Sequence, residues 1–369
     1  MSKRKASNPK PPPKSKPGQV VIVNPGGGYE VVKPDYNPEK DWSFKKSGCY
    51  NKLLWFCSDF NIIRNIMVSP TRGIYIMAND KVRDHAIALL NSIRVHDRET
   101  PVVLIPYDDR YQEVAAELAH RFSVHLFPDL DLLDRINRGV TSIFGKDTFP
   151  RPNQFRKQAC WFGPFEEFLY IDTDIIVFSR IVQCLDFLDR ADFICMDHQR
   201  NGGIYGIFSQ SVIDEGVLTE HHLREIFNAG FWGGKRSAMS EQKLFEALED
   251  GARNMRYFDF STKKASDMPV FNWLVIKHFT RKLNLVDVIG YRAGSWAGTR
   301  GYKWIKWGGL FDPHRKEALH YMHWAGIKIQ PGYPYWRIWA RYRLMGDPSE
   351  RVRVLENDLR HTWALIKNR

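Results

Sequence analysis

Long apolar runs are absent from this chain of 369 residues. A membrane-spanning helix needs about 18–20 consecutive apolar residues, and no stretch reaches that length. The basic start, residues 1–6, has no apolar segment behind it, so the sequence predicts no secretory signal. Cysteine is also scarce and lacks the paired spacing of a zinc site; the residues are Cys49, Cys57, Cys160, Cys184 and Cys195. This odd, unpaired set favours a reduced, cytoplasmic setting.

Positive charge is concentrated in the two ends of the chain. The formal net charge is +12, of which residues 1–17 supply +6 and residues 331–369 supply +4. Nucleic-acid-binding folds usually carry their basic patch on the folded domain, so we expect no specific nucleic-acid partner. Polybasic ends are typical of solvated tails or of segments attracted to anionic lipid.

Composition divides the chain into four parts. Residues 1–18 are rich in Lys, Pro and Ser, which predicts a disordered basic tail. Residues 19–69 form an N-terminal extension, whose glycine run at 26–28 lacks the Lys and Ser/Thr of a phosphate loop and predicts a turn. Residues 70–330 alternate between strand and helix patterns, and residues 331–369 predict a C-terminal helical extension.

The alternation from residue 70 onward predicts an α/β fold with a mainly parallel sheet. Its expected strands are residues 73–78, 101–105 and 123–127, and a buried strand that begins at residue 168 and has Asp172 and Asp174 at its end; its expected helices cover residues 86–93, 111–122 and 157–162. Such sheets bind ligands beyond the carboxyl ends of their strands. Asn79, Asp80, Asp108, Asp172 and Asp174 are expected at that edge. No internal repeat is present.

Two aspartates, Asp172 and Asp174, interrupt the apolar run at residues 168–178. A buried carboxylate without a partner is costly, and a divalent cation is an effective partner for two of them. Oxygen ligands suit Mg²⁺ and Mn²⁺, which also bind diphosphates. A strand-end turn with exposed acids is the alternative, which the apolar continuation after Asp174 disfavours. The sequence therefore predicts a metal site for a phosphorylated donor.

A second acidic group, Asp129, Asp131 and Asp134, also follows an expected strand. No apolar run continues after it, and Arg135 and Arg138 are close enough in sequence to neutralise it. A solvated loop or a helix start is the favoured interpretation, and metal binding the lesser one.

Several segments, taken in order, resemble the glycosyltransferases of the GT-A fold, and especially the retaining glycogenin/galactosyltransferase-like group, family 8. The segments that carry the resemblance are residues 75–80, 155–161, 170–174, 227–232, 267–272 and 323–328. Met268 stands where Gln is usual, and Lys328 stands one place early. The resemblance covers about residues 70–330. It implies a Rossmann-like, mainly parallel central sheet flanked by helices.

The resemblance also implies how a donor is held. Mn²⁺ or Mg²⁺ would be bound by Asp172, Asp174 and His323. A packed histidine is the alternative for His323, and His320 is its competitor as ligand. Lys157 or Lys328 would meet the diphosphate; for either, the alternative is a lysine on a solvated helix face.

Other residues are expected around the base and the sugar. Ala78, Asn79 and Asp80 would bind base or ribose, with simple turn chemistry as the alternative. Asn228 and Asp267 would face the transferred sugar. A loop residue and a helix N-cap are the respective alternatives. Met268 in place of Gln implies that the sugar can differ from glucose or galactose.

The function expected is therefore a cytoplasmic, metal-dependent glycosyltransferase with a nucleotide-sugar donor, UDP-linked, and an unknown acceptor. The resemblance favours retention. One rival is a nucleotidyltransferase of related fold, although residues 78–83 lack the glycine of its phosphate loop. The other is a non-catalytic lipid- or nucleic-acid-binding protein that uses the basic ends.

Two aromatic segments bear on the acceptor. Residues 294–309, rich in Trp and Gly, predict an acceptor-binding loop or core packing. Residues 333–343 combine aromatic residues with arginines, which suits a peripheral membrane contact or a helix packed on the catalytic domain. A membrane contact would fit a lipid-linked acceptor; a soluble glycan is the alternative.

Overall fold

The computed structural model describes residues 71–196, 206–260, 265–288, 294–305 and 309–347, together with the backbone of two short strands near the N-terminus. The chain divides into two compact units, Met1–Met67 and Val68–Arg369. In the first unit, β1 (Val20–Val23) pairs with β2 (Tyr29–Val32) in an antiparallel hairpin. The predicted basic tail, the turn at 26–28 and the chain beyond residue 347 lie outside the described residues.

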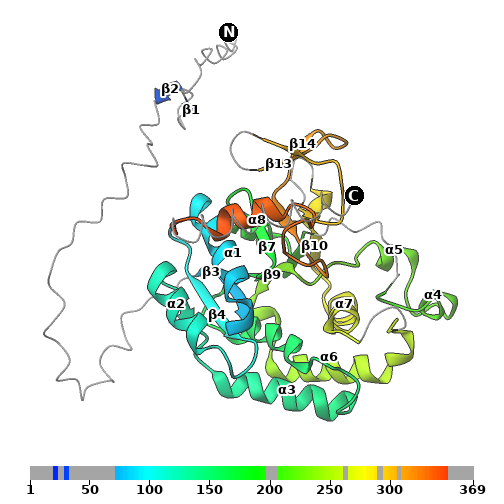
Figure 1. Cartoon of the computed structure of the whole chain (residues 1–369). Coiled ribbons are helices and arrows are strands. Elements are labelled where there is room, and N and C mark those ends of the chain that lie inside the picture. Colours follow the sequence, from blue (N-terminus) through cyan, green and yellow to red (C-terminus); the bar gives the residue numbers. More distant parts are fainter. Residues whose placement is uncertain are drawn as a thin grey trace, which may run out of the picture. The chain divides into compact units, whose positions relative to one another are not determined.

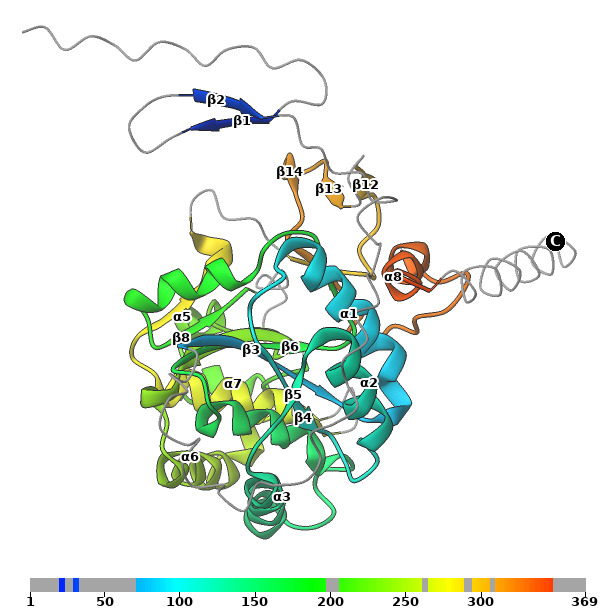
Figure 2. The ribbon, with the colours of Figure 1, turned by 90° about the vertical axis from the view of Figure 1, so that its left-hand side faces the viewer.

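The second unit is built on a seven-stranded sheet (Figure 2). Its strands, in spatial order, are β10 (Lys282–Asn284), β8 (Phe193–Cys195), β9 (Phe231–Lys235), β6 (Glu167–Asp172), β3 (Arg72–Ala78), β4 (Val102–Pro106) and β5 (His125–Leu126). Only β9 runs antiparallel to its neighbours. The predicted mainly parallel α/β sheet is confirmed, although β5 is shorter than the expected strand at 123–127.

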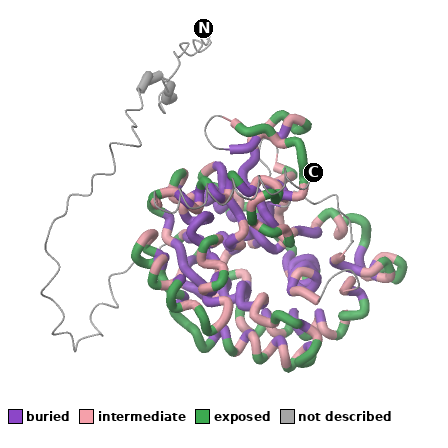
Figure 3. The backbone as a smooth tube through the Cα atoms, in the orientation of Figure 1, coloured by how far each residue is buried: buried purple, intermediate pink, exposed green. Residues whose placement is uncertain are grey.

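Helices cover both faces of this sheet (Figures 1 and 2). On one face lie α1 (Arg83–His96) and α2 (Gln112–Phe122). On the other lie α3 (Leu130–Phe144), the 3₁₀ segment η3 (Pro152–Phe162), α6 (Glu241–Arg253) and α7 (Asp267–His278). Successive side chains of β3 point to opposite faces of the sheet. Ile74 and Ile76 pack with the helices of the first face, and Tyr75 packs with those of the second. Helix α7 is buried along most of its length (Figure 3).

Shorter elements complete the described part of this unit. They are the helices η2 (Asp80–Val82), η4 (Val182–Asp189), α4 (Ser211–Asp214), α5 (Glu220–Leu223), η6 (Arg236–Ala238), η7 (Met255–Tyr257) and η8 (Leu285–Asp287), and a three-stranded sheet of β12 (Lys303–Trp304), β13 (Leu310–Asp312) and β14 (Glu317–Ala318).

The apolar run at residues 168–178 is divided between two strands, and the two aspartates lie at and just after the end of the first, where the sequence predicted a strand end. Strand β6 ends at Asp172, the chain turns through Thr173 and Asp174, and β7 (Ile175–Val177) joins a different sheet. That sheet has the order β11 (Ser295–Trp296), β15 (Tyr321–His323), β7. Both halves of the run are apolar because each strand is buried in its own sheet, so the two aspartates lie at the junction of two sheets.

The C-terminal helix α8 (Trp336–Arg343) packs on α1. The Asn91 side chain donates to Tyr342 O at 2.8 Å, and Arg343 pairs with Asp84 at 2.7 Å. Tyr342 is buried, and the Trp339 ring lies 5.4 Å from the His85 ring. The structure therefore shows the packed-helix alternative for this segment. Among the described helices, none is long and apolar enough to cross a bilayer.

This packing predicts the effect of truncating α8 at its buried face. Ile338 is buried among residues of α1, β7 and β15, so Ile338→Ala should lower the free energy of unfolding by about 2–5 kcal/mol. Arg337→Ala, at an exposed position of the same helix, should cost less than about 1 kcal/mol. Urea denaturation of both variants measures the difference; equal losses would contradict the packed helix.

Candidate metal and donor site

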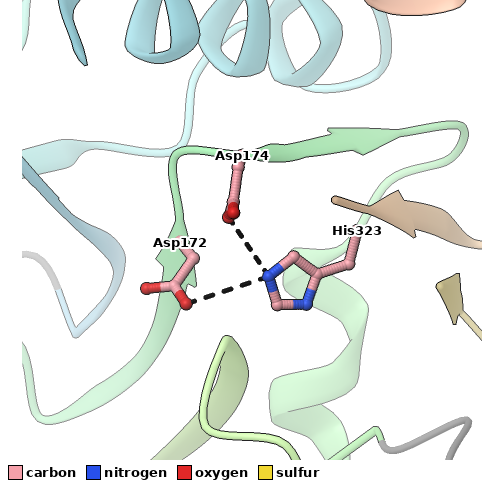
Figure 4. A group of neighbouring side chains, drawn as sticks. All are labelled: Asp172, Asp174 and His323. Carbon is pink, nitrogen blue, oxygen red and sulfur yellow. Dashed lines mark ion pairs between the residues drawn. The ribbon is translucent and has the colours of Figure 1, made fainter. Parts of the chain in front are cut away.

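Three side chains converge at the junction of the two sheets (Figure 4). Asp172 ends β6, Asp174 lies in the turn that follows, and His323 ends β15. His323 Nε2 lies 3.1 Å from Asp174 Oδ1 and 3.9 Å from Asp172 Oδ2. One potential ligand atom from each residue falls within 4.8 Å of the other two. Within the described residues this is the group that offers a site for a metal ion.

The donor set fits a hard or borderline divalent cation. Two atoms bound to one ion at about 2.1 Å lie about 3 Å apart, close to the observed distance between His323 and Asp174. Carboxylates suit Mg²⁺ and Mn²⁺, and imidazole is accepted by the first-row metals. The structure thus brings together all three residues of the predicted metal set; metal binding itself stays a prediction.

The pKa shifts of the three groups show that the two carboxylates are stabilised by nearby positive charge. Burial raises the pKa of Asp172, and the Asp174 carboxylate adds to the rise although Lys157 opposes it. Burial acts on Asp174 in the same direction, but His323 outweighs it and holds the pKa of Asp174 below its usual range. Burial lowers the pKa of His323, and the two aspartates more than reverse this. A cation between the carboxylates would stabilise their ionised forms in the same way.

Two residues absent from the sequence prediction hold Asp172 in place. Tyr170 donates its hydroxyl to Asp172 Oδ1 at 2.6 Å, and Gly230 O accepts from Asp172 N at 2.8 Å. A Cβ on Gly230 would lie 2.9 Å from Asp172 Oδ2 and closer still to His323 Cε1. Side chains two residues apart in a strand point to the same face. The sequence could therefore have predicted that Tyr170 lies beside Asp172.

Lys157 and Asp267 form a buried ion pair beside the metal group. Their charged atoms are 2.9 Å apart, and each side chain is 6% exposed. The Lys157 ammonium also lies 5.3 Å from the centre of the Tyr170 ring. Burial lowers the pKa of Lys157, but Asp267 and the aspartates at 172 and 174 outweigh it and raise the value. Of the two alternatives for Lys157, the solvated helix face is therefore wrong.

The segment that carries Asn228 is clamped to helix α7 by Asn272. Asn272 Oδ1 accepts from Phe227 N at 2.9 Å, and its Nδ2 donates to Phe227 O and to Met268 O at 3.0 Å each. Asn228 Oδ1 accepts from Gly230 N at 3.0 Å. Sequence reasoning used Asn272 only as a family marker and missed this positioning role.

The expected nucleotide residues follow β3 as predicted. Ala78 is buried and its carbonyl accepts from Tyr107 N at 2.9 Å. The Asn79 amide donates to Asp108 Oδ2 at 2.8 Å, while Asp80 Oδ1 accepts from Val114 N at 2.8 Å. Asn79 and Asp80 therefore already hold the β3 and β4 loops together. Their contact with a base or ribose stays a prediction.

Three other candidates lie outside the cluster. Lys328 is exposed, and in the part of the chain that the structure describes it pairs with none of the site carboxylates. His320 contacts Ser179, and its Nε2 lies 3.7 Å from Cys184 Sγ, so it does not join the metal group. Asp129 accepts from Leu132 N at 2.9 Å and caps α3, which confirms the helix start.

A cavity of about 230 Å³ also opens near the carboxyl ends of β8 and β10. Phe193, Arg224 and Lys282 are among its lining residues, but none of the predicted site residues is. The chemistry of the converging side chains, and not this cavity, therefore defines the candidate site.

The fold matches solved glycosyltransferases. The bifunctional glycosyltransferase WbbM in its apo form is similar over 80% of this chain at 15% identity, with a TM-score of 0.52. This chain has the GT-A glycosyltransferase fold. It spans about half of that structure, since 53% of the WbbM chain is covered.

A second solved structure is the galactosyltransferase LgtC in complex with donor and acceptor sugar analogues. It is similar over 73% of this chain and 93% of its own, at 12% identity and a TM-score of 0.48. No family model matches the sequence, and no curated protein matches it either. Membership of family 8 in particular stays a prediction.

The contact of Gly230 with both a carboxylate and an imidazole gives a test of the site. Gly230→Ala should displace Asp172 or His323 and weaken Mn²⁺ binding at least about tenfold, because metal affinity depends on ligand geometry. Gly251→Ala is the control: a Cβ there meets its neighbours at 3.7 Å, and alanine suits the interior of a helix. Mn²⁺ titration followed by electron paramagnetic resonance measures both. Wild-type affinity in the Gly230 variant would count against this geometry.

Proposed function

We propose that this protein is a metal-dependent glycosyltransferase that transfers a sugar, with retention, from a UDP-linked donor to a hydroxyl of its acceptor. The observation that carries the proposal is the convergence of Asp172, Asp174 and His323 at the carboxyl end of β6. In an α/β sheet this edge is where ligands bind, and the fold is that of glycosyltransferases.

The proposed reaction builds negative charge on the departing diphosphate. The bond from the anomeric carbon to the β-phosphate oxygen breaks, and its electron pair stays on that oxygen. The acceptor hydroxyl oxygen forms the new bond to the anomeric carbon, and its proton passes to the diphosphate. A bound divalent ion would stabilise the leaving group as a Lewis acid. Asp172, Asp174 and His323 would hold that ion.

The remaining residues have separate roles in this proposal. Lys157 supplies a fixed positive charge at the diphosphate, which supports the same charge development. Asp267 and Asn228 lie on segments joined by Asn272, and we assign them to hydroxyl groups of the transferred sugar. Met268 adjoins them with an apolar side chain, which favours a sugar with fewer polar contacts at that point.

The acceptor is less constrained. A lipid-linked acceptor is supported by the basic residues 1–17, each worth about 1 kcal/mol at an anionic surface. The aromatic face of α8 no longer supports it, since Tyr342 is buried and Trp339 packs against His85. A soluble glycan is therefore an equal proposal.

Donor binding should depend on the metal. At least one of UDP-glucose, UDP-galactose, UDP-N-acetylglucosamine and UDP-xylose, with Mn²⁺, should raise the Tm, by about 2–4 °C for each kcal/mol of binding free energy, and chelator should remove the shift. In Asp174→Ala the shift should disappear and donor turnover should fall at least about 100-fold. Differential scanning fluorimetry and release of UDP measure the two effects. Turnover at the wild-type rate in this variant would falsify the metal-dependent mechanism.

Substitution of His323 and of His320 should have different effects on Mn²⁺ affinity. His323→Ala removes one of three ligands and should weaken Mn²⁺ binding about 10–100-fold. His320→Ala should keep Mn²⁺ affinity within about twofold but lower the Tm, because His320 is buried against Ser179 and Cys184. Isothermal titration with Mn²⁺ and thermal unfolding measure these effects. The reverse order of affinities would transfer the ligand role to His320.

A further inference from the structure

Trp296 projects to the same side of its sheet as the metal group. It is the second residue of β11, and its register partner in the parallel ladder is His323. Directly paired residues of neighbouring strands leave a sheet on the same face. The indole Nε1 donates to Ala325 O at 2.9 Å, which fixes the ring alongside residues 323–325. The ring therefore lies beside His323, which in turn contacts Asp174.

The indole is held in one orientation but is only partly buried. A Cβ on Gly298 would overlap its six-membered ring, so the ring packs directly on the glycine backbone. Trp296 belongs to none of the three hydrophobic clusters that the described residues form, whereas Trp324 and Trp232 are completely buried. A rigid aromatic ring with solvent access is a preformed contact surface and not a core residue.

The strand order places this ring across His323 from the two aspartates. Strand β15 lies between β11 and β7. His323 pairs with Ile175 of β7 on one side and with Trp296 of β11 on the other. Ile175 directly follows Asp174 in the chain. An acceptor stacked on the indole would therefore lie on the opposite side of His323 from Asp174.

We propose that Trp296 is the stacking platform for the acceptor, and that the acceptor is a carbohydrate. The C–H face of a pyranose is apolar and packs on an indole, while its hydroxyl groups stay at the edge of the ring. Stacked there, one hydroxyl would point toward the anomeric carbon of the donor. The inference rests on the proposed function, because an acceptor platform has meaning only where a donor is bound.

The test separates transfer to a sugar from transfer to water. Purified full-length protein, Mn²⁺ and the UDP-sugar that raises the Tm most would be incubated with and without methyl glycosides of glucose, galactose, mannose and N-acetylglucosamine. UDP release gives the total rate, and mass spectrometry gives the glycoside product. The variants are Trp296→Ala and Trp296→Phe. The control is Phe122→Ala, which removes a partly buried aromatic ring at the end of α2, outside the candidate site.

Trp296→Ala should lower the ratio of transfer to hydrolysis at least about tenfold, as expected for the loss of one stacking contact, mainly through a higher KM for the glycoside. Trp296→Phe should recover part of the loss, and Phe122→Ala should keep the wild-type ratio. An unchanged ratio in Trp296→Ala, an equal loss in Phe122→Ala, or no transfer by the wild type to any of the glycosides would overturn the platform. None of these outcomes contradicts the glycosyltransferase proposal. That proposal fails instead if Asp174→Ala hydrolyses the donor at the wild-type rate.

Discussion

The repulsion between two carboxylates held side by side is the constraint on which the rest of this site depends. The side chains of Asp172 and Asp174 are 30% and 35% exposed at a junction between two sheets, so solvent screens their charges only in part, and two like charges there disfavour each other's ionised form. Three groups stabilise the carboxylates. His323 from β15 and Lys157 from η3 supply positive charge, and the hydroxyl of Tyr170, on β6 itself, donates a hydrogen bond. The compensation is incomplete in one respect, since His323 carries charge only when it is protonated. A bound cation would complete it, with His323 in its neutral form as a ligand.

The junction also explains why so many segments converge at one point. The chain leaves the seven-stranded sheet after Asp172 and enters the three-stranded sheet at Ile175, so partners of both sheets reach the turn between them. Strand β9 brings Gly230 against Asp172, and β15 brings His323 against Asp174. Gly230 has no side chain, and any Cβ there would occupy the space that the carboxylate and the imidazole share.

Local periodicity was enough to predict β3, β4, α1, α2 and the strand that ends at Asp172, but of α3 only a helix start was expected. The sequence also did not show that the apolar residues after Asp174 belong to a second sheet. Thr173 carries no strong turn signal, and both flanks are apolar. The difference lies in their pairing partners, β9 for β6 and β15 for β7, which are far along the chain and leave no local trace. Membership of the metal group was easier to predict, since Asp172, Asp174 and His323 are chemically distinctive.

The ion pair between Lys157 and Asp267 could not be predicted from the sequence either. Lys157 and Asp267 were each expected to contact the donor separately, yet they form a nearly solvent-free ion pair with each other. Removing either partner would leave an uncompensated buried charge, which costs about 3–5 kcal/mol. Their two roles are therefore coupled. In the proposed reaction, Asp267 sets the position from which the Lys157 charge acts on the diphosphate, and Lys157 sets the position from which the Asp267 carboxylate meets the sugar. A substitution of either residue would therefore disturb recognition of both parts of the donor.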